Sequence, residues 1–217
     1  MDFVLAVDLD GVCADHAEAF RGVVAAERGL TPTDLPPQST WDFHEWGLTD
    51  DDFEHLHRRA VLVHRMFRDM PAVPGAAEAL WRLSDAGVWI RIVTHRLYAN
   101  WGHAIAAADT VAWLDQVGIP YRDLCFLGRK PAVEADLYVE DAPHNVEELR
   151  SVGNAVVVFD QPYNRHLAAP RAVTWEEVEQ LVVETRLARG EAVAVPLPLP
   201  GDPDDRLQHQ LGGPQPD

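Results

Sequence analysis

Residues 3–12 read FVLAVDLDGV: five apolar residues, then two carboxylates, Asp8 and Asp10, separated by one leucine. An unbroken apolar run of this kind is typical of a strand that is buried on both faces of a parallel sheet. Asp8 would then stand at the carboxyl end of the strand. The same form, an apolar run followed by a polar group, recurs at 88–93 before Thr94, at 137–139 before Glu140-Asp141, and at 155–159 before Asp160.

Helical patterns lie between these apolar runs and indicate how the strands connect. They cover residues 76–86, 99–117 and 143–152, each followed by a glycine, and a last one covers 175–189. Strands that alternate with helices predict an α/β fold with a doubly wound parallel sheet. Right-handed crossovers bring the carboxyl ends of such strands to one edge, where ligands bind. We therefore expect Asp8, Thr94 and Asp141 to converge.

One long segment interrupts this alternation. It contains little strand pattern but two helical stretches, at about 17–28 and 50–70. We expect this segment to form a small helical cap over the strand ends. After the last helix the composition shifts to Pro, Gly, Asp and Gln, which is typical of a flexible tail. The expected units are a core of residues 1–14 and 74–190, a cap of residues 15–73, and a tail of residues 191–217.

The composition limits the class of protein and its partners. The chain has 217 residues, of which 47% are hydrophobic, enough to form a full core. It has neither a membrane-length apolar stretch nor a signal-like leader, so we expect a cytoplasmic protein without a membrane partner. A net charge of −17 argues against a nucleic-acid polymer as partner, because phosphate backbones are bound by clustered Lys and Arg. Lys130 is the only lysine among 18 basic residues, which makes its position informative.

The Asp8-Asp10 pair could hold a hard cation and also present a nucleophile. It does not fit a calcium loop, because the fifth and twelfth loop positions are Val12 and Ala19, which lack side-chain oxygens. From the pair alone, a phosphate site and a solvated turn both remain open.

Three further groups favour the phosphate site. Thr94 supplies a hydroxyl, Lys130 an ammonium and Asp141 a third carboxylate. Each residue also has a structural interpretation, since Thr is common in strands, a loop lysine can be solvated, and Asp141 could cap a helix. Their joint order, however, matches what a phosphoryl group in transfer needs around its oxygens.

With these residues in place, the sequence resembles the haloacid dehalogenase superfamily of phosphatases, which has a Rossmann-like core. The resemblance rests on DLDGV at 8–12, on Thr94 at a strand end, on Lys130, and on DLYVED at 136–141. It implies that Asp8 is a covalent nucleophile, that Asp10 is a general acid and base, and that Thr94 and Lys130 bind phosphate. It also implies a Mg²⁺ ion held by Asp8, Asp10 and Asp141.

Within the superfamily the chain is most similar to the 5'(3')-deoxyribonucleotidase group, through DLDGVCAD at 8–15, TWDF at 40–43 and ADLYVEDAPHN at 135–145. This resemblance implies a nucleoside monophosphate as the substrate. The chain departs from the animal members at two places: His16 stands where they carry an aromatic residue, and His95-Arg96 follow Thr94 where they have Ser.

Candidate substrate contacts are His16, Trp41, His95 and Arg96, with Arg96 available for a second anionic group. The cap aromatics could offer a face to a planar base, although such residues usually form the core of a small cap. Histidines 55, 57 and 64 are expected to be surface or packing residues. Two alternatives stay open: a phosphatase of another small metabolite such as a sugar phosphate, and a non-enzymatic phospho-accepting receiver module.

Overall fold

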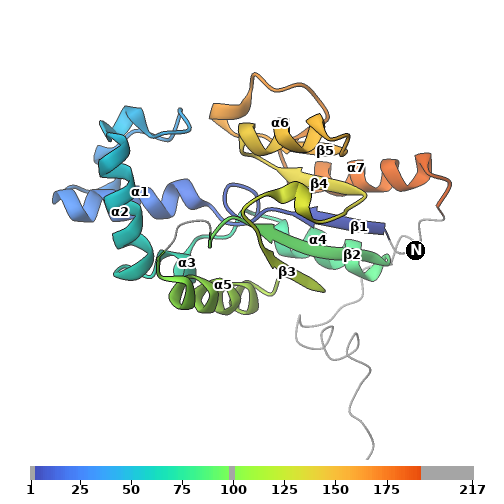
Figure 1. Cartoon of the computed structure of the whole chain (residues 1–217), viewed down its shortest axis with the longest axis horizontal. Helices are drawn as coiled ribbons and strands as arrows, with labels where there is room; N and C mark the ends of the chain where they lie inside the picture. Colours follow the sequence, from blue (N-terminus) through green and yellow to red (C-terminus); the bar gives the residue numbers. More distant parts are fainter. Residues whose placement is uncertain (1–2, 98–100, 192–217) are drawn as a thin grey trace, which may run out of the picture.

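A computed structural model describes residues 3–97 and 101–191 (Figure 1). Its strands are β1 (Phe3–Val7), β2 (Val88–Thr94), β3 (Asp123–Phe126), β4 (Leu137–Glu140), β5 (Val156–Phe159) and β6 (Arg171–Ala172). Its helices are α1 (His16–Arg28), α2 (Asp50–Leu62), α3 (Met66–Asp69), α4 (Ala76–Asp85), α5 (His103–Val117), α6 (Pro143–Ser151) and α7 (Trp175–Ala188). Four 3₁₀ turns are η1 (Pro32–Asp34), η2 (His44–Trp46), η3 (Lys130–Ala132) and η4 (Pro162–Asn164).

The six strands form one sheet in the order β3-β2-β1-β4-β5-β6, and every neighbouring pair is parallel. The predicted α/β fold with a doubly wound parallel sheet is confirmed. The chain order reverses at β1, because β2 lies on one side of it and β4 on the other. In open α/β sheets such a reversal marks the crevice in which ligands bind, just beyond the strand ends.

Helices cover both faces of the sheet, and the alternation of side chains along β1 shows how. Leu5 belongs to the main hydrophobic core together with Leu80 of α4 and Trp175 of α7. Ala6 points to the opposite face and packs in a second cluster with Val146 of α6. Burial on both faces explains why this strand is an unbroken apolar run in the sequence.

Helices α1, α2 and α3 separate β1 from α4 and lie beyond the carboxyl ends of the strands (Figure 1). Asp15 caps α1 by accepting a hydrogen bond from the backbone N–H of Glu18 at 3.0 Å. The helix expected over 50–70 is in fact two helices. The break falls at Arg65, whose backbone is left-handed with φ of 55° and whose guanidinium pairs with Asp109 of α5 at 2.6 Å.

The aromatic residues of this segment mainly pack against one another. Phe20, Phe43 and Trp46 expose at most 3% of their surface, and the rings of Phe43 and Trp46 lie 4.6 Å apart. The expectation that such aromatics form the core of the segment holds for these three residues. Trp41 differs from them, because 48% of its surface is exposed.

Two strands, β3 and β6, were not predicted from the sequence. Both are short and lie at the edges of the sheet, and β3 is only half-buried along its length. The helix expected over 99–117 begins at His103, with 98–100 outside the described residues. The predicted tail also lies outside them, except for Glu191.

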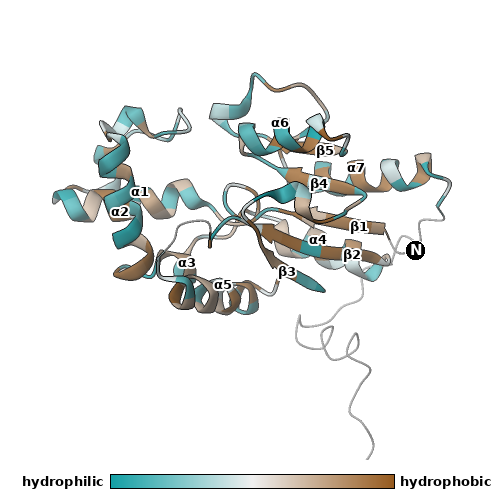
Figure 2. Cartoon of the chain, in the orientation of Figure 1, coloured by the Kyte–Doolittle hydropathy of each residue, from teal (hydrophilic) through white to brown (hydrophobic). Residues whose placement is uncertain are grey.

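The hydropathy of the elements follows their position. Strands β1 and β2 are mostly hydrophobic, whereas α2 is largely hydrophilic (Figure 2). None of the described helices is long and apolar enough to span a bilayer.

Candidate functional site

The carboxyl ends of β1, β2 and β4 lie next to one another because β1 is flanked by the other two strands. Val7, the last residue of β1, is paired with Ile92 of β2 and with Val139 of β4. The backbone N–H of Asp8 continues this ladder by donating to the carbonyl oxygen of Val139 at 3.1 Å. Thr94, which ends β2, is buried. The predicted convergence of the strand-end residues on one edge therefore matches the observed register.

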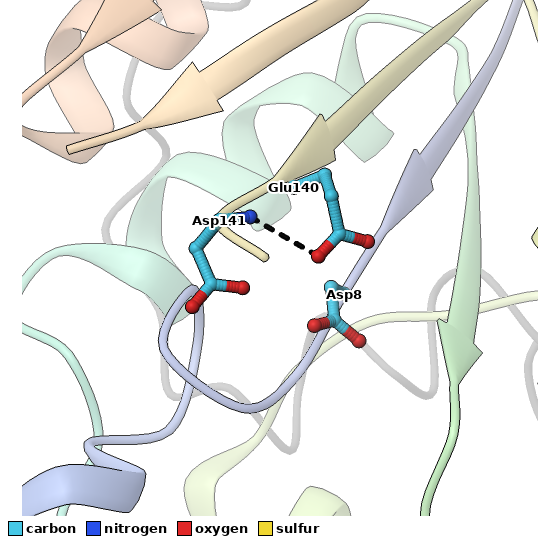
Figure 3. A group of neighbouring side chains, drawn as sticks. All are labelled: Asp8, Glu140 and Asp141. Carbon is cyan, nitrogen blue, oxygen red and sulfur yellow. Dashed lines mark hydrogen bonds between the residues drawn. The ribbon is translucent and has the colours of Figure 1, made fainter. Parts of the chain in front are cut away.

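Three carboxylates gather at this edge (Figure 3). Asp8 comes from the end of β1, while Glu140 and Asp141 come from the end of β4, and each exposes no more than 8% of its surface. One oxygen from each carboxylate lies within 4.8 Å of the other two. The side chain of Asp10 is not part of this cluster.

Lys130 lies against the acidic cluster and is itself buried. Its Nζ is 2.6 Å from Oδ1 of Asp8 and also contacts Oε2 of Glu140. Burial would lower the pKa of Lys130, but the charges of the two carboxylates outweigh burial and raise this pKa. The other oxygen of Glu140, Oε1, accepts hydrogen bonds from the backbone N–H groups of Ala142 at 3.0 Å and Asp141 at 3.2 Å. Both oxygens of Glu140 therefore have partners, and Glu140 holds the ammonium group of Lys130 beside Asp8.

The carboxylates of Asp8 and Asp141 fit the binding of a hard divalent cation. Oδ1 of Asp141 is buried and has no hydrogen-bond partner among the described residues. Burial raises the pKa of Asp8 to about 7, although Lys130 opposes this shift. Burial, together with the charges of Glu140 and Asp8, raises the pKa of Asp141 well above its ordinary value. A divalent cation would offset this excess of buried negative charge, and carboxylate oxygens are the ligands that hard cations prefer.

Asp10 points to Arg96 instead of toward the cluster. Nη2 of Arg96 donates to Oδ1 of Asp10 at 2.6 Å, and Nε lies 3.1 Å from Oδ2. Burial would raise the pKa of Asp10, but the charge and hydrogen bonds of the guanidinium outweigh it, so the pKa is lowered. Arg96 also donates to Thr110 at 3.2 Å and lies over the ring of Phe67, 4.4 Å from its centroid. We expected Arg96 to bind an anionic group of the substrate, but its side chain is fully buried and pairs with Asp10.

The other candidate substrate residues lie at different depths around this edge. His16, the first residue of α1, is half-buried, and burial lowers its pKa. Burial and then the charge of Lys130 lower the pKa of His95, which is also half-buried. Trp41 contacts the core through edge-to-face packing on His144 and Tyr163, each at 5.3 Å between ring centroids.

Two more residues lie near the site, and only the second of them, Tyr163, was not named from the sequence. His57 was expected to be a surface or packing residue, and it does pack: its ring lies 5.7 Å from that of His16 and 6.0 Å from that of Phe67, and burial lowers its pKa to about 4. Tyr163 donates a hydrogen bond from its hydroxyl to Oδ2 of Asp141. The only sequence signal for Tyr163 is its place shortly after a strand end, a position it shares with Asp8.

Comparisons with known proteins show a family and a fold that this chain matches. Residues 2–188 match the model of the family "5' nucleotidase, deoxy (Pyrimidine), cytosolic type C protein". A Chlorobaculum tepidum protein named "Putative 5'(3')-deoxyribonucleotidase" is 45% identical over 181 residues, covering 82% of this chain and 89% of the relative. The 5'(3')-deoxyribonucleotidase of Bacillus subtilis is 24% identical over 186 residues, covering 83% of this chain and 98% of the relative.

Solved structures support the fold. A HAD-superfamily hydrolase of Geobacter sulfurreducens superposes with a TM-score of 0.50 at 18% identity, covering 83% of this chain and 96% of that one. A phosphonoacetaldehyde hydrolase-like protein of Oleispira antarctica reaches a TM-score of 0.54 at 15% identity, covering 88% and 95%.

The family match also decides between the classes left open by the sequence. It includes the helical segment between β1 and α4 as well as all the strand ends. A non-enzymatic receiver module is therefore excluded. The chain belongs to the family of cytosolic type C 5'-deoxynucleotidases, which are phosphomonoester hydrolases with a haloacid dehalogenase fold.

Proposed function

We propose that this protein is a Mg²⁺-dependent phosphatase that acts through an aspartyl-phosphate and hydrolyses (deoxy)nucleoside 5'-monophosphates. The observation that carries the proposal is the position of Asp8. Its carboxylate stands at the end of the central strand, beside the Lys130 ammonium and within reach of the same cation as Asp141. A nucleophile placed between two cationic groups can approach a phosphoryl dianion that would otherwise repel it.

In the first step, an oxygen of Asp8 attacks phosphorus in line, and the bond from phosphorus to the nucleoside oxygen breaks. This forms the aspartyl-phosphate and releases the nucleoside. In the second step, water attacks the same phosphorus, which frees Asp8 and inorganic phosphate. Lys130 and the hydroxyl of Thr94 hold the phosphate oxygens through both steps. A bound Mg²⁺ would be held by Asp8, Asp141 and the backbone of Asp10, and would neutralise charge on the phosphoryl oxygens.

Asp10 is the proton carrier of this scheme. Its pairing with Arg96 keeps it ionised in the free protein, which suits the second step, where it takes a proton from water. For the first step it must donate a proton to the leaving oxygen. The negative charge of an incoming phosphate raises the proton affinity of Asp10 and so favours its protonated form. Arg96 fixes the direction of the carboxylate through two nitrogen donors.

We assign substrate selection to residues 15–73 as a cap and to the residues where this segment meets the core. Trp41 packs on His144 and Tyr163 of the core, the charges of Asp10 and Arg96 act on His16, and the charge of Lys130 acts on His95. Rings at these positions could contact a base or a sugar. The names of the relatives support a nucleotide substrate over other phosphomonoesters.

A phosphate-release panel tests both the chemistry and the substrate. The purified protein is assayed with nucleoside and deoxynucleoside monophosphates and with sugar phosphates, with and without Mg²⁺. We expect activity that requires Mg²⁺ and is highest on nucleotides. Equal or faster hydrolysis of sugar phosphates would instead assign the protein to another metabolite.

Asp8→Asn tests the covalent step, and Asp160→Asn is its matched control, because Asp160 also follows a strand but pairs with Arg171. We expect Asp8→Asn to lose turnover by about 10³-fold or more while Asp160→Asn keeps it. Acid-quenched wild-type protein should show the mass of one added phosphoryl group, and Asp8→Asn should not. Turnover by Asp8→Asn at the wild-type rate would refute the proposed nucleophile.

A further inference from the structure

The turn after β5 connects the two halves of the acidic site. It comprises residues 161–164 and contains η4. The side-chain amide of Gln161 donates to the carbonyl oxygen of Gly11 at 2.7 Å, in the loop that follows Asp8. The amide of Asn164, which is fully buried, donates to the carbonyl oxygen of Asp141 at 2.8 Å. The turn is therefore attached both to the loop after β1 and to the residue after β4.

Tyr163 lies between these two attachments and contacts the carboxylate of Asp141. Its hydroxyl donates to Oδ2, and its ring packs edge-to-face against Trp41. The Asn164 anchor next to it is itself fixed, because Arg171 donates to Oδ1 of Asn164 at 2.8 Å. The ring of Tyr163 thus packs on Trp41 while the residue next to it is held by hydrogen bonds, and together these contacts fix the position of its hydroxyl.

The two oxygens of Asp141 are consequently not equivalent. Oδ2 accepts the hydrogen bond from Tyr163, whereas Oδ1 is buried and lacks a hydrogen-bond partner in the described part of the chain. A buried carboxylate oxygen without a partner is costly, unless a ligand supplies one. One oxygen of the Asp141 carboxylate lies within 4.8 Å of a carboxylate oxygen of Asp8 and of one of Glu140.

We propose that Tyr163 is a positioning residue of the metal site: by binding Oδ2 of Asp141 it presents Oδ1 to the cation. The inference rests on the proposed function, since it assumes that Asp141 is a metal ligand. A hydrogen bond to the second oxygen stops rotation of the carboxylate about its terminal torsion. The carboxylate is then oriented before the cation arrives, so cation binding does not carry the entropic cost of ordering this carboxylate.

Tyr163→Phe tests this role, because it removes the hydroxyl and keeps the ring that packs on Trp41. Tyr121→Phe is the matched control, since it removes a hydroxyl from a half-buried tyrosine in the loop before β3, away from the acidic cluster. Asp141→Asn serves as the reference for loss of the ligand. Binding of Mg²⁺ alone is measured by titration calorimetry on metal-free, full-length protein without substrate, and Mg²⁺ activation of phosphate release is measured in parallel.

We expect Tyr163→Phe to weaken Mg²⁺ binding by about 10- to 100-fold, the usual effect of losing such a supporting hydrogen bond. Excess Mg²⁺ should restore most of its turnover, because the ligand itself is still present. A purely structural role would instead lower turnover at all Mg²⁺ concentrations. Tyr121→Phe should bind Mg²⁺ as the wild type does.

The outcomes separate this inference from the proposed function. If Asp141→Asn abolishes Mg²⁺ binding but Tyr163→Phe binds as tightly as the wild type, the positioning role is wrong and the metal site stands. If Asp141→Asn binds Mg²⁺ as the wild type does, the metal site itself is wrong, and the role of Tyr163 fails with it.

Discussion

Gly11→Ala should inactivate the protein by displacing a single carboxylate. Gly11 follows Asp10 with φ of +82°, a backbone conformation that glycine adopts without strain. A Cβ atom at this position would lie 2.1 Å from Oδ2 and 2.7 Å from Cγ of Asp141. Non-bonded carbon contacts are normally about 3.5 Å, so the carboxylate would have to move by roughly 1 Å or more. The contact with Tyr163 would be disturbed as well, because its hydroxyl lies 3.0 Å from the same Cβ.

Gly29→Ala provides the matched control for the backbone cost. Gly29 ends α1 with φ of +68°, and a Cβ there would meet no described atom within 4 Å. Each substitution should cost about 1 to 2 kcal/mol of unfolding free energy, because an alanine must adopt a left-handed backbone. Only Gly11→Ala should also reduce turnover, by about 100-fold, since a misplacement of about 1 Å in an active site has an effect of that order.

Two measurements separate these effects. Urea unfolding gives the stability of each variant, and phosphate release over a series of Mg²⁺ concentrations gives its activity. We expect comparable losses of stability in the two variants and loss of activity in Gly11→Ala alone. Full activity of Gly11→Ala, or equal inactivation of both variants, would refute the reasoning.

Three further predictions concern charged groups of the site and its surroundings. Lys130→Met leaves the buried carboxylates of Asp8 and Glu140 without their cation and should lower the unfolding free energy by about 3 to 5 kcal/mol. A loss below about 1 kcal/mol would show that Lys130 and the two carboxylates are not buried as described. Asp10→Asn leaves the buried guanidinium of Arg96 without its carboxylate and should lower the melting temperature. The turnover of the protein that stays folded should fall by about 10² to 10⁴-fold, and an unchanged rate would exclude Asp10 as the proton carrier. Burial, and then the nearby His16, lowers the pKa of His57 from 6.5 to about 4, so between these pH values the unfolded state binds a proton that the folded state does not. The contribution of His57 to stability should therefore fall by up to about 3 kcal/mol from pH 6.5 to pH 4. Because the raised pKa of Asp8 acts in the opposite direction over this range, the contribution of His57 is read from urea unfolding as the difference between the pH profiles of the wild type and His57→Phe. Identical pH profiles would contradict this assignment.

The fold could be predicted from the sequence because its main elements are encoded locally. A strand buried on both faces must be apolar throughout, and β1 is, so residues 3–7 are recognisable without any partner. The helices α4, α5 and α6 each end one or two residues before a glycine for a similarly local reason. Strands β3 and β6 were missed because they are short edge strands, and their hydrogen bonds come from neighbours rather than from their own composition.

The sequence by itself also determined which strand ends carry the chemistry, because parallel strands with helical crossovers must end at one edge. That rule brought Asp8, Thr94 and Asp141 together without coordinates. It could not assign partners within the site. Arg96 pairs with Asp10 across 86 positions of sequence, and Tyr163 reaches Asp141 from the turn after another strand. Such pairings depend on the direction and burial of side chains from separate elements, so only the tertiary structure decided them.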